Sequence, residues 1–285
     1  MPELPEVETV VRGLRAPLVG RTITSFWNDW PRSIGMPDPD SFAARVVGQT
    51  VQAIDRRAKY IVCTLDHDLL IVHLKMTGRL YVAPPDVPHE ADRWVHVKLG
   101  LSDGRELRFS DSRKFGKVFL TGDFASITPG AAALGPEPLD DSFTADVFRA
   151  RMKGRSTALK ALLLDQSFIA GVGNIYADEA LFRAKLHPLR RADTLTKAEA
   201  AALHATVQAV LREGIDHEGA SVNWYRKPDG TTGEAQRHFY VYGREGEPCL
   251  MCGAPLHKIR VAQRGTHFCP TCQPEARPRK RRAAR

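Results

Sequence analysis

The sequence contains no long hydrophobic run and no basic, apolar leader at its start. Its longest apolar runs, such as residues 69–74, are much shorter than the about 18 residues that a membrane-spanning helix needs. The opening residues are acidic where a secretory signal is basic. We therefore expect a soluble, cytoplasmic protein with no membrane partner. A chain of 285 residues can bury a sizeable core, in two domains or in one domain with appendages.

The body of the chain also lacks a strong net charge. The formal net charge is +8, but the segment after Glu275 holds six bases and no acid, which leaves +2 for the preceding residues. Local clusters of bases therefore say more than the total, and they occur at residues 56–59, 113–114 and 149–160. The Pro/Arg/Ala-rich tail, residues 276–285, is predicted to be disordered, as an accessory electrostatic arm or as a solubilising end.

Cysteine is scarce outside one C-terminal cluster. Cys249 and Cys252 form one CxxC pair, Cys269 and Cys272 form another, and sixteen residues separate the pairs. This spacing is typical of a tetrahedral zinc site with four thiolate ligands and no open position, hence a structural zinc ion. Two disulfides are the alternative, although nothing in the sequence indicates an oxidising compartment. Cys63, the fifth cysteine, lies in an apolar run and is most simply a core residue.

The first part of the chain is rich in predicted strands. Two hairpins are expected, one pairing residues 60–65 with 69–74 and one pairing 95–101 with 107–109. A helix precedes them, because Val7, Val10, Val11 and Leu14 follow helical spacing. We predict a β-sandwich or barrel with an attached N-terminal helix up to about residue 130, followed by an interdomain link at residues 128–138.

Helical signals dominate after the link. Residues 158–164 and 176–182 are predicted helices, and a capping box at Thr196 and Glu199 begins a third helix that Gly214 should end. The glycine-punctuated turn 171–174 between the first two is either a phosphate-binding helix N-terminus or a steric helix–helix corner. Between the two cysteine pairs, residues 259–268 should form a β-hairpin with Arg264 and Gly265 at its tip.

The opening residues permit unusual chemistry. A small second residue favours removal of Met1, which would leave Pro2 as a free secondary amine. Such an amine, with a pKa near 8, forms an iminium Schiff base with a sugar aldehyde carbon, and Glu3 would be an adjacent general acid/base. The alternative is purely structural, because proline and glutamate both suit the first turn of a helix.

Taken together, these segments resemble the formamidopyrimidine-DNA glycosylase family of base-excision repair enzymes. The resemblance spans the chain from Pro2 to Cys272, and its motifs occur in the family's order: residues 1–9, 57–60, 134–138, 171–176, 241–244 and the cysteine pairs. It implies an α+β multidomain protein. The expected parts are a catalytic β-sandwich with a leading helix (1–130), a helical helix-two-turn-helix DNA-binding domain (131–240), a zinc-finger β-hairpin (241–275) and the basic tail (276–285).

The resemblance also implies catalytic roles. Pro2 would be the nucleophile at the sugar C1′, Glu3 the acid that assists ring opening, and Glu6 a support for the site. Lys59 would contact a phosphate beside the lesion and assist β-elimination. Arg264 would grip the flanking phosphates and assist δ-elimination.

Further residues are implied in DNA binding. Asn174 would bind the backbone, and Lys160 matches a lysine near the lesion. Met76, Arg113 and Phe115 match the residues that fill the gap left by the extruded nucleotide, whereas by themselves Met76 and Phe115 would read as core residues and Arg113 as a solvated charge.

Two positions depart from the family pattern. Trp94 stands near the place of a phosphate-binding histidine, and Ser156 replaces a basic residue. The neighbouring Arg93 and Arg155 could compensate for them. Without compensation, DNA affinity and its salt dependence would both fall.

We accordingly predict a monomeric, zinc-containing glycosylase and AP lyase for oxidised purines in double-stranded DNA, nucleoid-associated through that binding. An endonuclease VIII-type enzyme for oxidised pyrimidines is one alternative, although Leu4 favours the purine branch. A catalytically silent DNA-binding paralogue is the other.

Overall fold

The structure is a computed structural model that describes residues 1–222 and 224–275, so the predicted tail at 276–285 lies outside the described residues. Contacts divide the chain into two compact units. Unit 1 comprises Met1–Glu137 with Leu211–His238, and unit 2 comprises Pro138–Val210 with the chain from Phe239 onward. Among the described residues, no helix combines the length and apolarity required to cross a membrane.

Unit 1 contains two β-sheets, as the fold prediction requires. Both predicted hairpins form: Tyr60 pairs with His73, and Leu99 pairs with Leu107. All neighbouring strands are antiparallel except β2 and β9, which are parallel. The first sheet has the order β1 (Ile23–Asn28), β7 (Val95–Leu101), β8 (Glu106–Asp111), β6 (Gly78–Ala83). The second has the order β2 (Ile34–Met36), β9 (Lys117–Thr121), β5 (Leu69–His73), β4 (Tyr60–Thr64), β3 (Ala53–Arg57).

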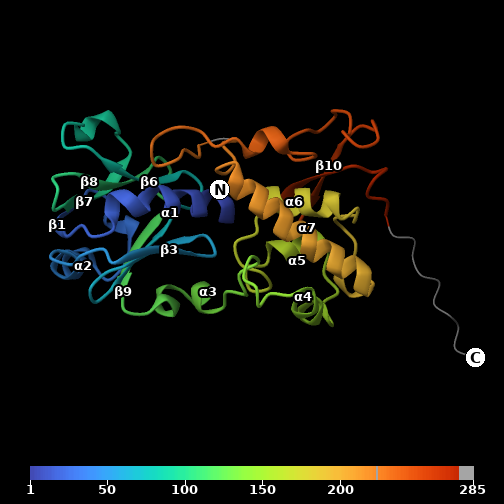
Figure 1. Cartoon of the computed structure of the whole chain (residues 1–285), viewed down its shortest axis with the longest axis horizontal. Helices are drawn as coiled ribbons and strands as arrows, with labels where there is room; N and C mark the ends of the chain where they lie inside the picture. The colour runs from blue at the N-terminus through green and yellow to red at the C-terminus, as the bar shows by residue number, and fades with distance from the viewer. Residues whose placement is uncertain (223, 276–285) are drawn as a thin grey trace, which may run out of the picture. The chain divides into compact units, whose positions relative to one another are not determined.

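Helix α1 (Leu4–Leu18) completes the core of unit 1. Its predicted apolar face is fully buried and shares one core cluster with side chains from both sheets. The helix contacts β3 and β4 of one sheet and β6 of the other (Figure 1). Pro5 lies in its first turn, where a missing amide hydrogen costs no helical hydrogen bond. Helix α2 (Pro39–Val46) begins at Asp38, whose carboxylate accepts a hydrogen bond from the Ser41 amide at 3.0 Å.

The predicted link contains a short helix and the boundary between the units. Helix α3 (Pro129–Ala132) begins at Thr128, whose hydroxyl accepts from the Ala131 amide. The division into units falls between Glu137 and Pro138. Short 3₁₀ turns complete the connections: η1 (Pro31–Ser33), η2 (His89–Ala91), η3 (Phe124–Ile127), η4 (Ala192–Thr194) and η5 (Ala235–His238).

The helices after the link are α4 (Ala145–Met152), α5 (Leu159–Leu164), α6 (Asn174–Arg183) and α7 (Lys197–Asp216) (Figure 1). The predicted capping box is present, since Glu199 accepts from the Thr196 amide at 2.8 Å and donates its own amide to the Thr196 hydroxyl at 3.2 Å. The predicted stop at Gly214 is wrong. Helix α7 continues to Asp216, and the chain leaves it through Gly219, which has a φ of +79° that favours glycine.

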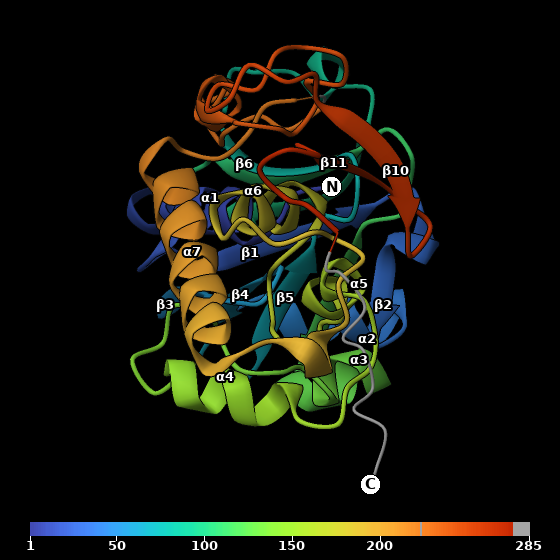
Figure 2. The ribbon, with the colours of Figure 1, turned by 90° about the vertical axis from the view of Figure 1, so that its right-hand side faces the viewer.

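The C-terminal segment of unit 2 forms the predicted hairpin from β10 (His257–Val261) and β11 (Arg264–Phe268), visible in Figure 2. Its predicted tip is displaced by two residues. Ala262 and Gln263 form the turn, with φ values of 47° and 62°, as a two-residue hairpin turn of the primed type requires. Arg264 is therefore the first residue of β11, paired with Val261 and exposed to solvent.

Candidate functional site

The chain start is held tightly in unit 1. Pro2 is buried, Glu3 is 3% exposed and Glu6 is 1% exposed. One oxygen of the Glu6 carboxylate accepts from the Glu3 amide at 2.7 Å, and the other accepts from the Ala220 amide at 2.8 Å. Met1, which we expect to be removed, is 47% exposed. Glu6 thus fixes the backbone next to Pro2 and also joins it to a segment that follows α7.

That segment also contacts Glu6 through two residues that the sequence did not single out. The Tyr225 hydroxyl lies 3.3 Å from the Glu6 carbonyl oxygen, and its pKa is raised by burial and then by the Glu6 charge. A Cβ added to Gly219 would lie 2.9 Å from Cγ of Glu6, so only glycine permits this approach. More than 200 residues separate these partners, and no local pattern could have indicated them.

Lys59 lies at the turn between β3 and β4 and is 6% exposed. The turn is anchored by Glu137, which accepts from Arg56 at 2.6 Å, from Arg57 at 2.7 Å and from the Ala58 amide at 2.6 Å. Ala58 has a φ of 53°, a conformation that persists only where contacts enforce it. Burial acts to raise the pKa of Glu137, but the Arg56 charge and these hydrogen bonds outweigh burial and lower it.

His73, at the end of β5, is a third residue that the sequence did not single out. Burial, and then the positive charges of Lys75 and Lys59, lower its pKa to about 3. Its Nδ1 accepts from the Lys75 amide at 3.0 Å, and its ring makes an edge contact with Tyr60 at 4.6 Å between centroids. The His73 imidazole is therefore neutral near pH 7, and it is close enough to Lys59 for the lysine charge to affect its pKa.

Met76, Arg113 and Phe115 form an exposed cluster, which we call the exposed triad. Met76 is 41% exposed and Phe115 is 50% exposed, so the interpretation of both as core residues is wrong. An Arg113 guanidinium nitrogen lies 3.1 Å from the Met76 sulfur, and the guanidinium carbon lies 4.9 Å from the Phe115 ring centroid. An apolar side chain and an aromatic ring thus flank one cation at the surface of unit 1.

The two positions that depart from the family pattern have different surroundings. Trp94 is 39% exposed, with the guanidinium carbon of Arg93 4.6 Å from its ring centroid, a cation–π arrangement. Arg155 donates to the Asp165 carboxylate at 3.1 Å and lies over the Phe168 ring. Arg155 would therefore have to share its charge between Asp165 and a phosphate.

In unit 2, Asn174 and the start of β11 lie together. Asn174 is the first residue of α6, and its side-chain nitrogen Nδ2 donates to the Gly265 carbonyl oxygen at 3.0 Å. Its buried side-chain oxygen has no hydrogen-bond partner among the described residues. The structure therefore brings Asn174 next to the residue that follows Arg264.

Lys160, predicted to lie near the lesion, is part of a buried cluster in unit 2. Its side chain is completely buried, and its ammonium donates to the Asn174 carbonyl oxygen at 2.7 Å and to the Asp178 carboxylate at 2.5 Å. The other Asp178 oxygen accepts from the His267 amide at 2.9 Å. Lys160 belongs to the cluster of bases at residues 149–160, but it is buried together with its neighbours Leu159, Leu162 and Leu163, which direct this helix into the core.

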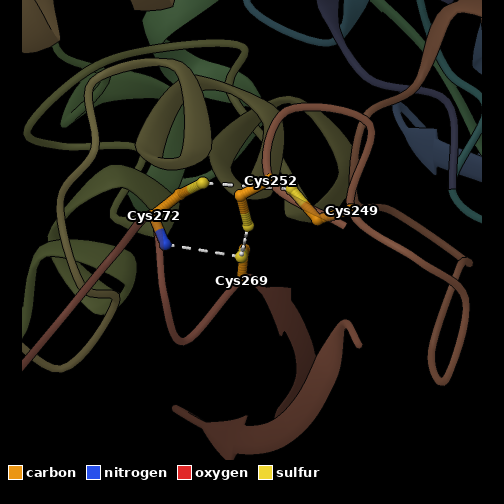
Figure 3. Close-up of side chains that lie close together, drawn as sticks. All are labelled: Cys249, Cys252, Cys269 and Cys272. Carbon is orange, nitrogen blue, oxygen red and sulfur yellow. Dashed lines mark hydrogen bonds between the residues drawn. The ribbon is translucent and has the colours of Figure 1, made fainter. Parts of the chain in front are cut away.

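The four C-terminal cysteines are arranged as a metal site. Their sulfur atoms all lie within 4.8 Å of one another, with 3.9 Å between Cys249 and Cys272 and 3.5 Å between Cys252 and Cys269 (Figure 3). Tetrahedral zinc with Zn–S bonds of about 2.3 Å requires sulfur separations of roughly 3.8 Å. All four cysteines are free thiols, so the disulfide alternative is wrong. The residues fit one structural zinc ion.

Cys63 is unrelated to this site. It is fully buried in the core of unit 1, and burial raises the pKa of its thiol to about 12. This confirms the prediction of a core cysteine.

Three family models match the chain in succession. The formamidopyrimidine-DNA glycosylase N-terminal domain matches residues 1–118, the H2TH (helix-two-turn-helix) domain of the same enzymes matches 134–225, and a zinc finger found in FPG and IleRS matches 246–274. These matches define a DNA glycosylase with a helix-two-turn-helix domain and a zinc finger.

Individual proteins are similar over nearly the whole chain. The formamidopyrimidine-DNA glycosylase of Herpetosiphon aurantiacus is 50% identical over 96% of this chain and 100% of its own. Two Lactococcus lactis enzyme structures, one with a Fapy-dG-containing DNA and one with an oxidised-pyrimidine-containing DNA, each have a TM-score of 0.87, at 36% and 37% identity, over 96% of this chain and 100% of theirs. The chain belongs to the formamidopyrimidine-DNA glycosylase family, whose members are base-excision repair glycosylases with AP lyase activity.

Proposed function

We propose that this glycosylase removes oxidised purines, namely 8-oxoguanine and formamidopyrimidines, from double-stranded DNA and then nicks the strand by β,δ-elimination. The names of its relatives and the Fapy-dG complex of the Lactococcus lactis enzyme support this substrate class. The protein would act as a monomer, in the cytoplasm and on the DNA of the nucleoid. The observation that carries the proposal is the pair of hydrogen bonds accepted by the Glu6 carboxylate, one from the Glu3 amide beside Pro2 and one from the Ala220 amide.

Catalysis would begin once Met1 is removed and the Pro2 nitrogen is a secondary amine. The nitrogen attacks C1′ of the damaged nucleotide, the new N–C1′ bond forms, and the glycosidic bond breaks as the base leaves with a proton. Glu3 would supply protons for sugar-ring opening and Schiff-base formation. The Glu3 side chain is nearly excluded from water, so bulk solvent has little access to the group that would transfer the proton.

Strand cleavage would follow from the Schiff base. The iminium acidifies the proton at C2′, whose loss expels the 3′ phosphate (β-elimination), and a second elimination expels the 5′ phosphate. Lys59, held in its turn by Glu137, would contact the first phosphate, and Arg264 would contact the flanking phosphates. Both cations stabilise the phosphate charge that develops as each leaving group departs.

The remaining sites would hold the DNA. The exposed triad would occupy the space of the extruded nucleotide, because an apolar wedge and an arginine recover part of the lost stacking and pairing. Asn174, Arg155 and Arg93 would bind the backbone. Lys160 would act indirectly, by positioning Asn174 through its carbonyl oxygen. We also propose that residues 1–130 form the catalytic domain. Residues 131–240 and the zinc finger at 241–275 would mainly bind the DNA.

A wider substrate range is supported by one comparison. A solved complex of the Lactococcus lactis enzyme contains an oxidised pyrimidine. A pyrimidine lesion is therefore the second substrate to test, and a DNA-binding protein without catalysis is the remaining alternative.

Borohydride trapping tests these proposals together. A duplex with 8-oxoguanine opposite cytosine should give a covalent adduct that maps to Pro2 and exceeds the adduct on a dihydrothymine duplex. Pro2→Gly should bind the same duplex but neither trap nor nick it. Stronger trapping on dihydrothymine would assign the pyrimidine class, and an undiminished adduct in Pro2→Gly would refute the nucleophile.

A further inference from the structure

Two loops of unit 1 carry the exposed triad, and both have the same unusual backbone. Met76 follows Lys75 in the turn between β5 and β6, and Phe115 follows Lys114 in the turn between β8 and β9. Lys75 has a φ of 52° and Lys114 a φ of 59°, left-handed conformations that side chains other than glycine rarely adopt. Such residues persist where surrounding contacts over-determine the backbone, so something must hold both turns.

The holding group is the carboxylate of Asp111, the last residue of β8, which is 1% exposed. One of its oxygens accepts from the Thr77 hydroxyl, in the first loop, and from the Arg113 amide at 3.2 Å, in the second. The other oxygen accepts from the Gly116 amide at 2.6 Å. A single buried carboxylate therefore bonds to the residue after Met76 and to residues on both sides of Phe115.

The backbone around Asp111 is equally constrained. Its amide donates to the Trp94 carbonyl oxygen at 2.8 Å, and Gly78 lies opposite it in the β6–β8 pair. A Cβ on Gly116 would lie 2.3 Å from the Phe109 ring, and one on Gly78 would lie 2.4 Å from the Leu74 carbonyl oxygen. Neither glycine can be replaced without moving backbone or a packed ring, so the two turns have little room to shift independently.

We propose that Asp111 is a positioning residue that locks the two loops into one rigid unit, so that Met76, Arg113 and Phe115 enter the DNA together. This inference rests on the proposed role of the exposed triad in filling the space of the extruded nucleotide. A wedge is effective only if it is already in place when the nucleotide leaves the stack. Otherwise, ordering two loops would add to the cost of extrusion.

Extrusion can be measured directly with 2-aminopurine placed beside the lesion, whose fluorescence rises when it unstacks. Asp111→Asn keeps the shape but turns one acceptor into a donor that faces backbone amides. We expect the extrusion rate on an 8-oxoguanine duplex to fall at least about tenfold, in line with the cost of misplacing a positioning group. Cleavage of a preformed abasic site in single-stranded DNA, which needs no extrusion, should stay within about twofold.

Asp68→Asn is the matched control. Asp68 is a buried carboxylate of the same unit, 8% exposed, that accepts from Arg45 and from Gln49 at 2.9 Å without touching either triad loop. Asp68→Asn should lower the thermal stability of the protein and leave the rate of nucleotide extrusion unchanged. If Asp111→Asn fails to fold, Thr77→Val carries the same test, and Thr77→Ser, which retains the hydroxyl, should restore extrusion.

Phe115→Ala separates the inference from the proposed function. If Phe115→Ala and Asp111→Asn both slow extrusion selectively, the inference stands. If Phe115→Ala slows extrusion while Asp111→Asn and Thr77→Val behave like Asp68→Asn, the inference is overturned and the triad keeps its proposed role. If Phe115→Ala leaves extrusion unchanged, the proposed role of the triad fails, and the inference fails with it.

Discussion

The side-chain nitrogen Nδ2 of Asn174 donates to the carbonyl oxygen of Gly265 at 3.0 Å, and Arg264 immediately precedes Gly265. The first turn of α6 and the first residues of β11 are thereby held together within unit 2. Both Asn174 and Arg264 are proposed phosphate ligands. Their contributions to DNA binding should therefore be coupled and not additive.

A double-mutant cycle measures this coupling. We expect Asn174→Ala and Arg264→Ala each to weaken duplex binding, and the double variant to be weaker by less than the product of the two effects. Loss of the Arg264 charge should also reduce the magnitude of the slope of log affinity against log salt by about one unit, whereas loss of the neutral Asn174 side chain should leave that slope unchanged. Strictly additive losses would show that the hydrogen bond to Gly265 does not link the two residues.

The buried Lys160–Asp178 pair predicts a large stability effect. Lys160→Met keeps the length of the side chain but leaves the Asp178 carboxylate without the ammonium, inside the core. Loss of one partner of a buried pair costs about 3–5 kcal/mol, which urea unfolding would detect. Lys258→Met is the control, because Lys258 pairs with Glu245 at 3.3 Å on the surface and should change stability by no more than about 0.5 kcal/mol. If Lys160→Met loses as little unfolding free energy as the control does, the buried Lys160–Asp178 pair does not stabilise the fold.

The zinc site predicts one metal ion per chain. Chelation, or Cys252→Ser, should release zinc and disorder the hairpin that carries Arg264, because a structural zinc ion contributes directly to folding. Duplex affinity should fall, while unit 1 keeps its fold, since its core contains none of the four ligands. Metal analysis and limited proteolysis would report the two effects. Cys63→Ala should retain its zinc, and loss of zinc from that variant would argue against the four-cysteine assignment.

The carboxylate of Glu137 predicts a pH dependence of stability. Its folded pKa is lowered, so its stabilising contribution is complete above the pKa of the unfolded chain, near 4.3, and is lost as the pH falls through the lower folded value. Unfolding free energy measured from pH 3 to pH 7 should therefore decline more steeply with acid in the wild type than in Glu137→Gln. Glu234→Gln, which alters an exposed pair with Arg237, should follow the wild-type curve. If unfolding free energy depends on pH identically in the wild type and in Glu137→Gln, Glu137 does not contribute to the loss of stability in acid.

Elements governed by local pattern were predictable from the sequence. Alternating and helical periodicities gave both hairpins of unit 1 and the helices α1, α5, α6 and α7, because these patterns depend on residues close together in the chain. The metal ligands were predictable for the same reason, since the CxxC spacing alone fixes two sulfur positions on each side of the hairpin.

Features that depend on distant partners were not predictable. The parallel pairing of β2 with β9 joins Ile34 to Val118, and neither strand signals the other. Lys160 shows the same limit at the level of one side chain. Its burial depends on Asp178, on a different helix, and a lysine in an apolar run is compatible with either an exposed or a paired, buried position. The end of α7 was misplaced because a glycine within a helix and a glycine that ends one look alike in sequence.

The contact between Glu6 and Ala220 has a consequence for the order of events during synthesis. Pro2 and Glu6 are synthesised long before the amide that satisfies the second Glu6 oxygen, which lies 214 residues after Glu6. Contacts of such wide sequence separation form late in folding, because the long intervening chain must first be ordered. The opening residues of a nascent chain thus remain without their final geometry until about three-quarters of the protein has been made. An incomplete polypeptide would carry the proposed nucleophile without the Ala220 contact that completes the surroundings of Glu6.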